Sequence, residues 1–153
     1  MSNPVDEGYV SFETAKLLKE KGFDRLTQFV WYERCPASLA CTNNEAFKPK
    51  FDYFYLDRFT ETSSKFSNNE CIPDYISGNV YCAPALWEAM KWLRDSHDKS
   101  IEPSSHGFKA NGVGWTASIF NLKNQDEDYG NLFFLSYEEA VEAAIKYCLE
   151  NLI

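Results

Sequence analysis

The sequence ends with LSYEEAVEAAIKYCLENLI, residues 135–153, and this stretch carries its clearest structural signal. Ser136 and Glu139 have the S-x-x-E spacing of a helix-starting capping box, and Leu135 stands just outside the box. Apolar residues then recur three and four positions apart, at Val141, Ala144, Ile145, Cys148, Leu149 and Leu152. The pattern predicts an amphipathic helix whose apolar stripe packs on a sheet. Burial of four of its larger side chains, at about 1.5–3 kcal/mol each, would supply several kcal/mol of docking energy.

The polar residues of this helix predict its exposed side. Glu138, Glu142 and Lys146 lie off the apolar stripe. Glu142 precedes Lys146 by four residues, which is the favourable order for an ion pair on one helix face. We therefore expect the helix to turn its carboxylates toward water.

The residues before this helix predict another helix followed by three strands. Pro84 suits the first turn of a helix that runs to about Ser96. Its expected stripe is Leu86, Ala89, Met90 and Leu93, flanked by Trp87 and Trp92. The expected strands are a short KSIEPS (99–104), GWTASIFNL (114–122) and NLFFL (131–135), with KNQDEDYGN (123–131) as a hairpin loop. In the second strand, Trp115, Ala117 and Ile119 alternate with Thr116, Ser118 and Phe120.

The first half of the chain predicts one short helix and two aromatic strands. Ser11 is a good N-cap for a helix from Phe12 to Lys21, and Gly22 suits a left-handed stop that returns Phe23 onto Leu18. TQFVWYE (27–33) and FDYFYLDRF (51–59) are rich in β-branched and aromatic residues. Residues 34–50 read as a long loop, and residues 60–82 as a polar, turn-rich link.

Together these elements predict an α+β protein built on a small antiparallel sheet with helices packed on it. The chain of 153 residues suits one domain with an extension. We expect residues 84–153 to form a helix-strand-strand-strand-helix core. Residues 1–83 would form an extension of one helix and aromatic strands, docked on that core as one compact unit.

Charge and cysteine content exclude several classes of function. The formal net charge is −8, and residues 123–153 hold 2 basic and 7 acidic groups, which argues against direct nucleic-acid binding. No apolar run reaches the roughly 18 residues of a membrane span, and the acidic, polar N-terminus is unlike a secretion signal. The odd count of 5 cysteines at irregular spacing favours reduced thiols and a cytoplasmic protein.

Motifs of metal and catalytic sites are incomplete in the sequence. The cysteine pairs 35/41 and 71/82 lack the short gaps of structural zinc sites, and no CxxC, HExxH or nucleophile elbow is present. Asn124, Asp126 and Asp128 begin like a calcium loop, but Tyr129 and Leu135 replace its glycine and glutamate. NGVGW (111–115) leads into a strand, whereas phosphate loops lead into a helix. We therefore predict no catalytic residue, no metal and no cofactor.

Five residues are candidates for binding a partner. His106 lies beside Gly107 in an expected irregular loop, and Lys109 and Trp115 flank the start of the strongest strand. Tyr53 and Tyr55 lie in the second aromatic strand, where stacking on bases and packing in a core are both open. His97 is expected to interact with the last carbonyls of its helix.

The order of elements after Pro84 resembles that of double-stranded-RNA-binding domains. WTASIF followed by FFLSYEEAVEAAIKYCLENL is also similar to the strand-then-helix ending of AP2-type and phage-integrase arm-binding domains. The basic residues of these families are missing, since Tyr137, Glu138 and Glu139 stand where the RNA-binding lysines would be. The fold analogy therefore does not carry the binding function with it.

The whole chain resembles a family of small proteins encoded by gut bacteria and their phages or mobile elements. Three segments carry this resemblance: YVSFETAKLLKEKGFD (9–24), APALWEAMKWLRDSHD (83–98) and SYEEAVEAAIKYCLENLI (136–153). It implies an origin in a mobile element but no activity.

Three hypotheses of function follow. The first is a noncatalytic binding or accessory protein that acts through contacts with a protein partner, with homodimer formation left open. The second is a nucleic-acid-associated protein, either a weak binder through the sheet and Lys16, Lys19 and Lys21 or an acidic mimic of a phosphate backbone. The third is a small enzyme with a cleft between the two halves, lined by His106 and tyrosines.

Overall fold

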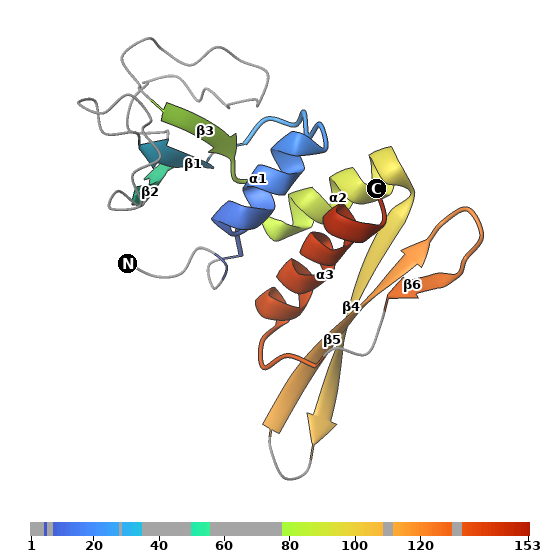
Figure 1. The fold of residues 1–153 in the computed structure, drawn as a ribbon. Helices are drawn as coiled ribbons and strands as arrows, with labels where there is room; N and C mark the ends of the chain where they lie inside the picture. The colour runs from blue at the N-terminus through green and yellow to red at the C-terminus, as the bar shows by residue number, and fades with distance from the viewer. Residues whose placement is uncertain are drawn as a thin grey trace.

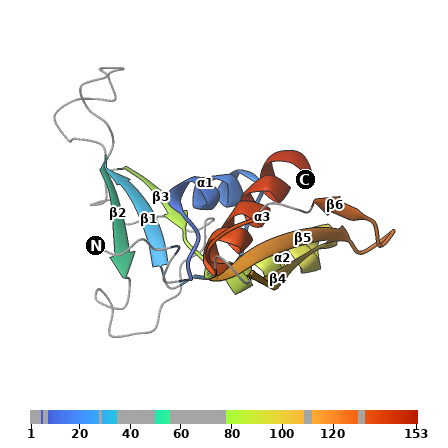
Figure 2. The ribbon, with the colours of Figure 1, turned by 90° about the horizontal axis from the view of Figure 1, so that it is seen from below.

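The described residues form three helices that lie between two antiparallel sheets (Figures 1 and 2). The structure is a computed structural model that describes residues 5, 8–27, 29–34, 50–55, 78–108, 112–129 and 133–153. This architecture confirms the predicted α+β class. The expected loop before Lys50 and most of the expected link before Gly78 lie outside the described residues.

The two sheets have three strands each, in the orders β2-β1-β3 and β4-β5-β6. The helices are α1 (Phe12–Glu20), α2 (Leu86–His97) and α3 (Tyr137–Asn151). The strands of the first sheet are β1 (Phe29–Arg34), β2 (Lys50–Tyr55) and β3 (Gly78–Cys82). The strands of the second sheet are β4 (Lys99–Phe108), β5 (Gly112–Asn121) and β6 (Glu127–Tyr129).

Helix α1 begins at the predicted residue and ends at Glu20, one residue before the predicted end, with the predicted cap and stop. The Ser11 hydroxyl accepts a hydrogen bond from the Thr14 N–H at 3.3 Å. Gly22 has a φ of +86°, which lets the Phe23 N–H turn back and bond the Leu18 carbonyl at 2.9 Å. The Phe23 side chain is buried, so the stop also anchors the helix in the core.

Helix α2 begins two residues later than predicted. Ala85 is its N-cap, and the Glu88 carboxylate accepts a hydrogen bond from the Ala85 N–H at 2.9 Å. The prediction that Pro84 stands in the first turn is wrong, because the Pro84 carbonyl instead accepts a bond from the Val10 N–H at 3.1 Å. This bond and a bridge between Tyr9 and Ala85 join the N-terminal segment to the start of α2.

The third strand of the second sheet lies earlier than predicted. Strand β6 lies inside the segment predicted as a hairpin loop, and residues 131 and 132 of the strand expected at 131–135 lie outside the described residues. A tight turn causes the early return: the Asn121 and Asn124 side chains accept backbone bonds from Lys123 and Asp126 at 3.0 and 3.1 Å. Within residues 133–135, Phe134 forms an isolated bridge to Trp115.

Two other strands differ from the prediction. Strand β4 runs through Phe108, so the segment around His106 that was expected to be an irregular loop is part of the sheet. Strand β3 was missed, because residues 60–82 read as polar and turn-rich. It pairs with β1 from Val30↔Cys82 to Arg34↔Gly78. The Tyr81 and Cys82 side chains are buried, which stabilises the strand despite its polar start.

Both halves of the chain contribute to one hydrophobic core. Val10, Leu18 and Phe23 from the first half share a buried cluster with residues of α2, β5 and α3. Trp31 of β1 packs edge-on against Phe12, and its indole N–H donates to the Val10 carbonyl at 3.0 Å. The segment before α1 and the helix itself are thereby fixed to the first sheet.

Helix α3 buries five of the six residues of the predicted stripe, and the sixth, Leu152 at its C-cap, is partly buried. The helix lies against elements on several sides. Ser136 caps it, since the Ser136 hydroxyl accepts from the Glu139 N–H at 3.1 Å. The helix contacts β4 and β5 on one side and α1 and α2 on others. Its buried residues are Ala140, Val141, Ala144, Ile145, Cys148 and Leu149.

The prediction that Glu142 faces water beside Lys146 is wrong. Oxygen Oε2 of Glu142 is sealed from solvent, and Oε1 accepts hydrogen bonds from the start of α1. Lys146 instead pairs with Glu13 of α1 at 2.5 Å. The helix is buried on the α1 side as well as on the sheet side, so part of its charged face is an internal contact.

Replacement of Ile145 by alanine tests the burial of α3. Ile145 has no exposed surface, so Ile145→Ala should lower the free energy of unfolding by about 2–5 kcal/mol. Glu150→Ala on the exposed side of the same helix should change it by less than about 0.5 kcal/mol. Urea titration of the three proteins measures both values, and equal stabilities would contradict the packing described above.

Candidate functional site

Glu142 of α3 places a carboxyl group against the start of α1, with its Oε2 buried. Its Oε1 accepts a hydrogen bond from the Ser11 N–H at 3.1 Å and from the Thr14 hydroxyl at 2.5 Å. The Ser11 hydroxyl also donates to the same oxygen. A carboxyl group of α3 therefore closes the N-terminal end of α1, where unpaired N–H groups and the helix dipole favour an acidic acceptor.

Burial raises the pKa of Glu142, and the hydrogen bonds from Ser11 and Thr14 oppose this rise without cancelling it. Oxygen Oε2 contributes to the rise, because it is buried and has no hydrogen-bond partner. The group has donors from one side only, so a bound proton relieves part of its desolvation. This cluster joins two helices and is partly buried between them.

The hairpin of β4 and β5 provides the exposed candidate site. Burial along β5 follows the predicted alternation, since Ala117 and Ile119 are buried on the face toward α3. Trp115 shares that face, and its ring packs edge-on against Tyr137 of α3 with centroids 5.3 Å apart. Thr116, Ser118 and Phe120 therefore lie on the opposite, outer face.

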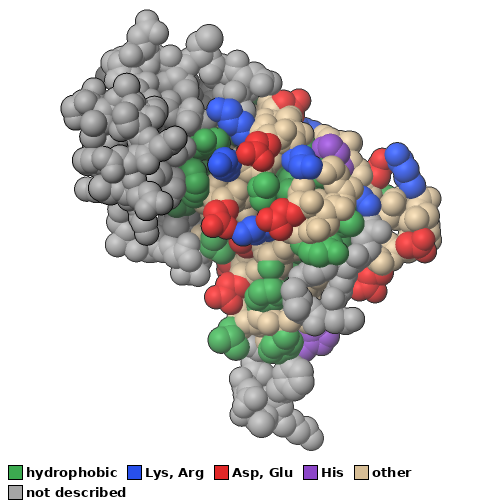
Figure 3. All heavy atoms as spheres, viewed as in Figure 1, with side chains coloured by type: hydrophobic (Ala, Val, Ile, Leu, Met, Phe, Trp, Pro, Cys, Tyr) green, Lys and Arg blue, Asp and Glu red, His purple; other side chains and the backbone are tan. Residues whose placement is uncertain are grey.

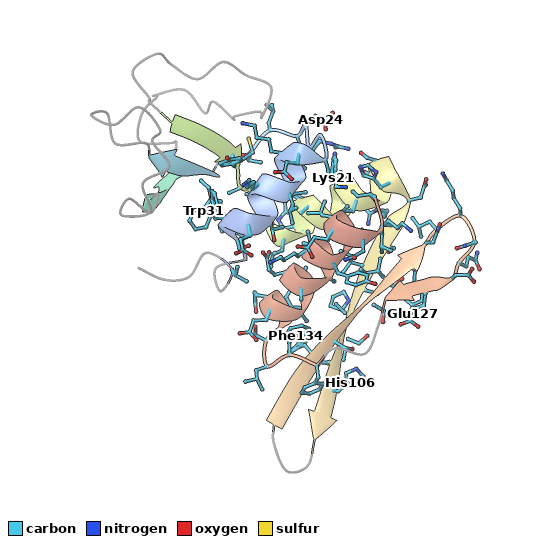
Figure 4. All side chains as sticks on the ribbon, viewed as in Figure 1. Lys21, Asp24, Trp31, His106, Glu127 and Phe134 are labelled. Carbon is cyan, nitrogen blue, oxygen red and sulfur yellow. The ribbon has the colours of Figure 1, made fainter. Side chains whose placement is uncertain are left out.

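His106 lies on the outer face of the hairpin. Its Nε2 is 2.9 Å from the Thr116 hydroxyl oxygen, a contact that spans the two strands. Figure 4 shows His106 on the part of the hairpin that extends beyond the helices, at the lower end of that view. The side chain of His106 is exposed.

Phe134 places two large apolar side chains on the same outer face. Its backbone exchanges two hydrogen bonds with Trp115, both at 2.8 Å, so Phe134 faces α3 as Trp115 does. In an extended segment the residues on either side point the opposite way, which puts Phe133 and Leu135 on the outer face. Phe133 is 47% exposed and Leu135 is 80% exposed.

The Phe133 ring lies directly on the backbone of Gly114. A Cβ added to Gly114 would lie 1.6 Å from Phe133 Cζ, which is far inside contact distance. Glycine is therefore required at position 114 for the ring to rest on the sheet. We call His106, Gly114, Thr116, Phe133 and Leu135 the outer-face surface; Figure 3 shows hydrophobic side chains gathered at this end of the molecule.

The structure separates the five binding residues predicted from the sequence. His106 belongs to the outer-face surface, whereas Trp115 lies on the reverse side of the same hairpin. Tyr53 and Tyr55 belong to β2, which lies in the other sheet, and their side chains are not described. Lys109 lies outside the described residues.

Sequence reasoning missed Phe133, Leu135 and Gly114. Leu135 stands just before a helix N-cap, where an apolar residue often packs on the first turn, yet it is 80% exposed. Gly112 was expected just before the strand and Gly114 at its first position, and both glycines belong to β5. A glycine inside a strand can also mark the close approach of another group. Gly114 was therefore the signal in the sequence that a side chain packs on this strand.

The remaining predicted groups have structural contacts. His97 packs against the Trp92 ring with centroids 4.6 Å apart, and burial followed by the charge of Lys21 lowers the pKa of His97. The side chains of Cys82 and Cys148 are buried. Within the described ranges, no three His, Cys, Asp or Glu side chains gather as a metal site, and no helix has the length and apolarity to cross a membrane.

Comparison of the chain with family models, with curated proteins and with solved structures finds no match.

The titration of Glu142 should appear in the pH dependence of stability. Because folding raises the pKa of this carboxyl, the folded chain holds the proton more tightly than the unfolded chain does. The free energy of unfolding should therefore fall as pH rises above the ordinary glutamate pKa of about 4.3. Glu142→Gln removes this term, so the stability of the variant relative to the natural chain should increase with pH.

Denaturant titrations between about pH 4 and 8 measure the effect, with Glu139→Gln on the exposed face of α3 as the charge-matched control. The control should leave the profile parallel to that of the natural chain. A constant difference between Glu142→Gln and the natural chain over this range would contradict the buried position of the carboxyl.

Gly114→Ala should lift the Phe133 ring from the sheet. The added methyl group occupies the position of the ring, and the ring can swing outward because it is partly exposed. We expect the chain to fold, with a loss of about 1–3 kcal/mol. Nuclear Overhauser contacts between the Phe133 ring and the backbone at position 114 should disappear, whereas Ser118→Ala on the same face should preserve them.

Proposed function

We propose that this protein is a noncatalytic binding protein whose outer-face surface contacts a protein partner. The observation that carries the proposal is the rigid presentation of Phe133 and Leu135. The bridge between Phe134 and Trp115 fixes both side chains toward solvent at 47% and 80% exposure. Exposed apolar side chains held in a fixed position are a common feature of protein interfaces.

The surroundings of this surface favour a partner with basic side chains. Glu138 and Glu139 follow Leu135 in the first turn of α3, and Glu102 stands on the outer face of β4. Among the described residues of this sheet face there is no lysine or arginine. A partner that combines apolar residues with lysine or arginine would complement both features.

The same charges disfavour a second copy of the chain as the partner. Two copies would each bring a net charge of −8 and would place acidic rims against each other. Nucleic acid is disfavoured on the same ground. In addition, Lys19 lies over the Tyr81 ring at 5.1 Å and Lys21 donates to the Ile153 carbonyl, so two of the three candidate phosphate-binding lysines have contacts within the chain.

Affinity capture with matched variants tests the proposal. The natural chain, a double variant Phe133→Ser with Leu135→Ser, and Trp87→Ser would be immobilised and exposed to lysate of the source cells. Trp87 is 64% exposed on α2 and provides an apolar control away from the surface. We expect one protein to be retained by the natural chain and by Trp87→Ser, to be lost from the double variant, and to elute earlier as salt rises.

Retention of the same proteins by the natural chain and the double variant would contradict the proposal. So would the absence of any protein retained by the natural chain, or loss of binding in Trp87→Ser to the same extent as in the double variant.

A further inference from the structure

The backbone hydrogen bonds of β5 alternate between its two neighbours. Trp115 exchanges both of its backbone bonds with Phe134, and the Asn121 N–H donates to Asp126, so these odd-numbered residues bond away from β4. The Leu122 N–H, just beyond the strand, donates toward the β4 side, to the Asp98 carbonyl at 2.8 Å. In an antiparallel pair this alternation is strict, so even-numbered residues of β5 bond to β4.

The register then fixes the direction of each backbone group in β4. Pro103 lies opposite Ala117 and Ser105 lies opposite Trp115, and both are partners of outward-bonding residues. Pro103, Ser105 and Gly107 therefore direct their backbone groups away from β5, to the outer edge of the sheet. Pro103 has no N–H to offer, and it costs the sheet no hydrogen bond at this position.

Beyond Pro103 this edge is open to solvent. No described strand pairs with the outer edge of β4. Ser104, Ser105 and His106 are all exposed, although successive residues face opposite sides of the sheet. The hairpin projects past the helices here (Figure 1), whereas Ile101, before Pro103, is buried.

We propose that an extended segment of the partner protein adds to the sheet along β4 from Ser105 to Phe108; this inference rests on the proposed function. Ser105 and Gly107 each supply one N–H and one carbonyl to the added strand, and the Pro103 carbonyl supplies one more acceptor. Pairing stops there because Pro103 has no donor. The added strand lies beside His106, whose contact with Thr116 continues the face toward Phe133.

Pro103 also determines which occupant fits. Two β4 edges that met antiparallel would each bring a proline without an N–H, and each copy would add its negative charge. When the added strand contains no proline, the only missing backbone donor in the pairing is that of Pro103. Basic and apolar side chains in alternation would face Glu102 and the outer-face surface of the sheet.

Proline and threonine replacements at the edge test strand addition. Ser105→Pro removes an outward N–H that β5 does not use, and Ser105→Thr keeps it. Pro103→Thr adds an outward N–H and lengthens the pairing edge. Circular dichroism and urea titration would first establish that each variant folds. If Ser105→Pro does not fold, Pro103→Thr still tests the proposal, because it should increase the affinity for the added strand.

The probe is a phage-displayed library of random peptides of about ten residues, the length of a long strand. Peptides enriched on the natural chain would be synthesised and titrated against each variant by fluorescence anisotropy. We expect Ser105→Pro to weaken binding about tenfold or more, Ser105→Thr to leave it unchanged, and Pro103→Thr to tighten it.

Failure to enrich any peptide would overturn strand addition, and so would equal affinity for Ser105→Pro and the natural chain. The affinity capture described above separates this failure from failure of the proposed function. If the captured protein is lost from the Phe133/Leu135 double variant but retained by Ser105→Pro, the binding surface stands and strand addition is wrong.

Discussion

The contact between Glu142 and the start of α1 links the two halves of this protein. Helix α3 already packs against β4 and β5, as an amphipathic helix beside a sheet should. The carboxyl of Glu142 adds a second attachment on another side, where it accepts bonds from Ser11 and Thr14. Helix α1 in turn contacts β3, so α3 lies between the two sheets and transmits the position of one to the other.

The same helix positions the exposed surface. Its first turn holds Tyr137 against Trp115, and Trp115 holds Phe134 through two backbone bonds. Phe134 and Tyr137 therefore hold the backbone that carries Phe133 and Leu135, and the Phe133 ring rests on Gly114. Partly buried aromatic residues packed on one face of the hairpin thus support an apolar surface on the other. Strand β4 completes that face and offers its outer edge beyond Pro103.

The amphipathic patterns of the three helices were sufficient to predict their existence and most of their boundaries from the sequence. The contacts that surround each helix were harder to predict from the sequence. The buried positions of α3 run from Ala140 to Leu149, about 180° around the helix axis, which is wider than one sheet-facing stripe and favours burial on more than one side. Glu142 lies at the margin of this arc, and a charged residue there reads as exposed unless its partners, more than 125 positions earlier, are known.

The surface at Phe133 and Leu135 depends on the register of the bridge to Trp115, which local pattern does not determine.

Titration of the Glu142 side-chain carboxyl by carbon-13 NMR tests this account most directly, because the account depends on that group being buried between α1 and α3. We expect its midpoint to lie above that of an ordinary glutamate, and the amide proton of Ser11 to shift with the same midpoint. A midpoint at or below the ordinary glutamate value, with a Ser11 amide that does not follow it, would contradict the contact and the arrangement of the two halves that depends on it.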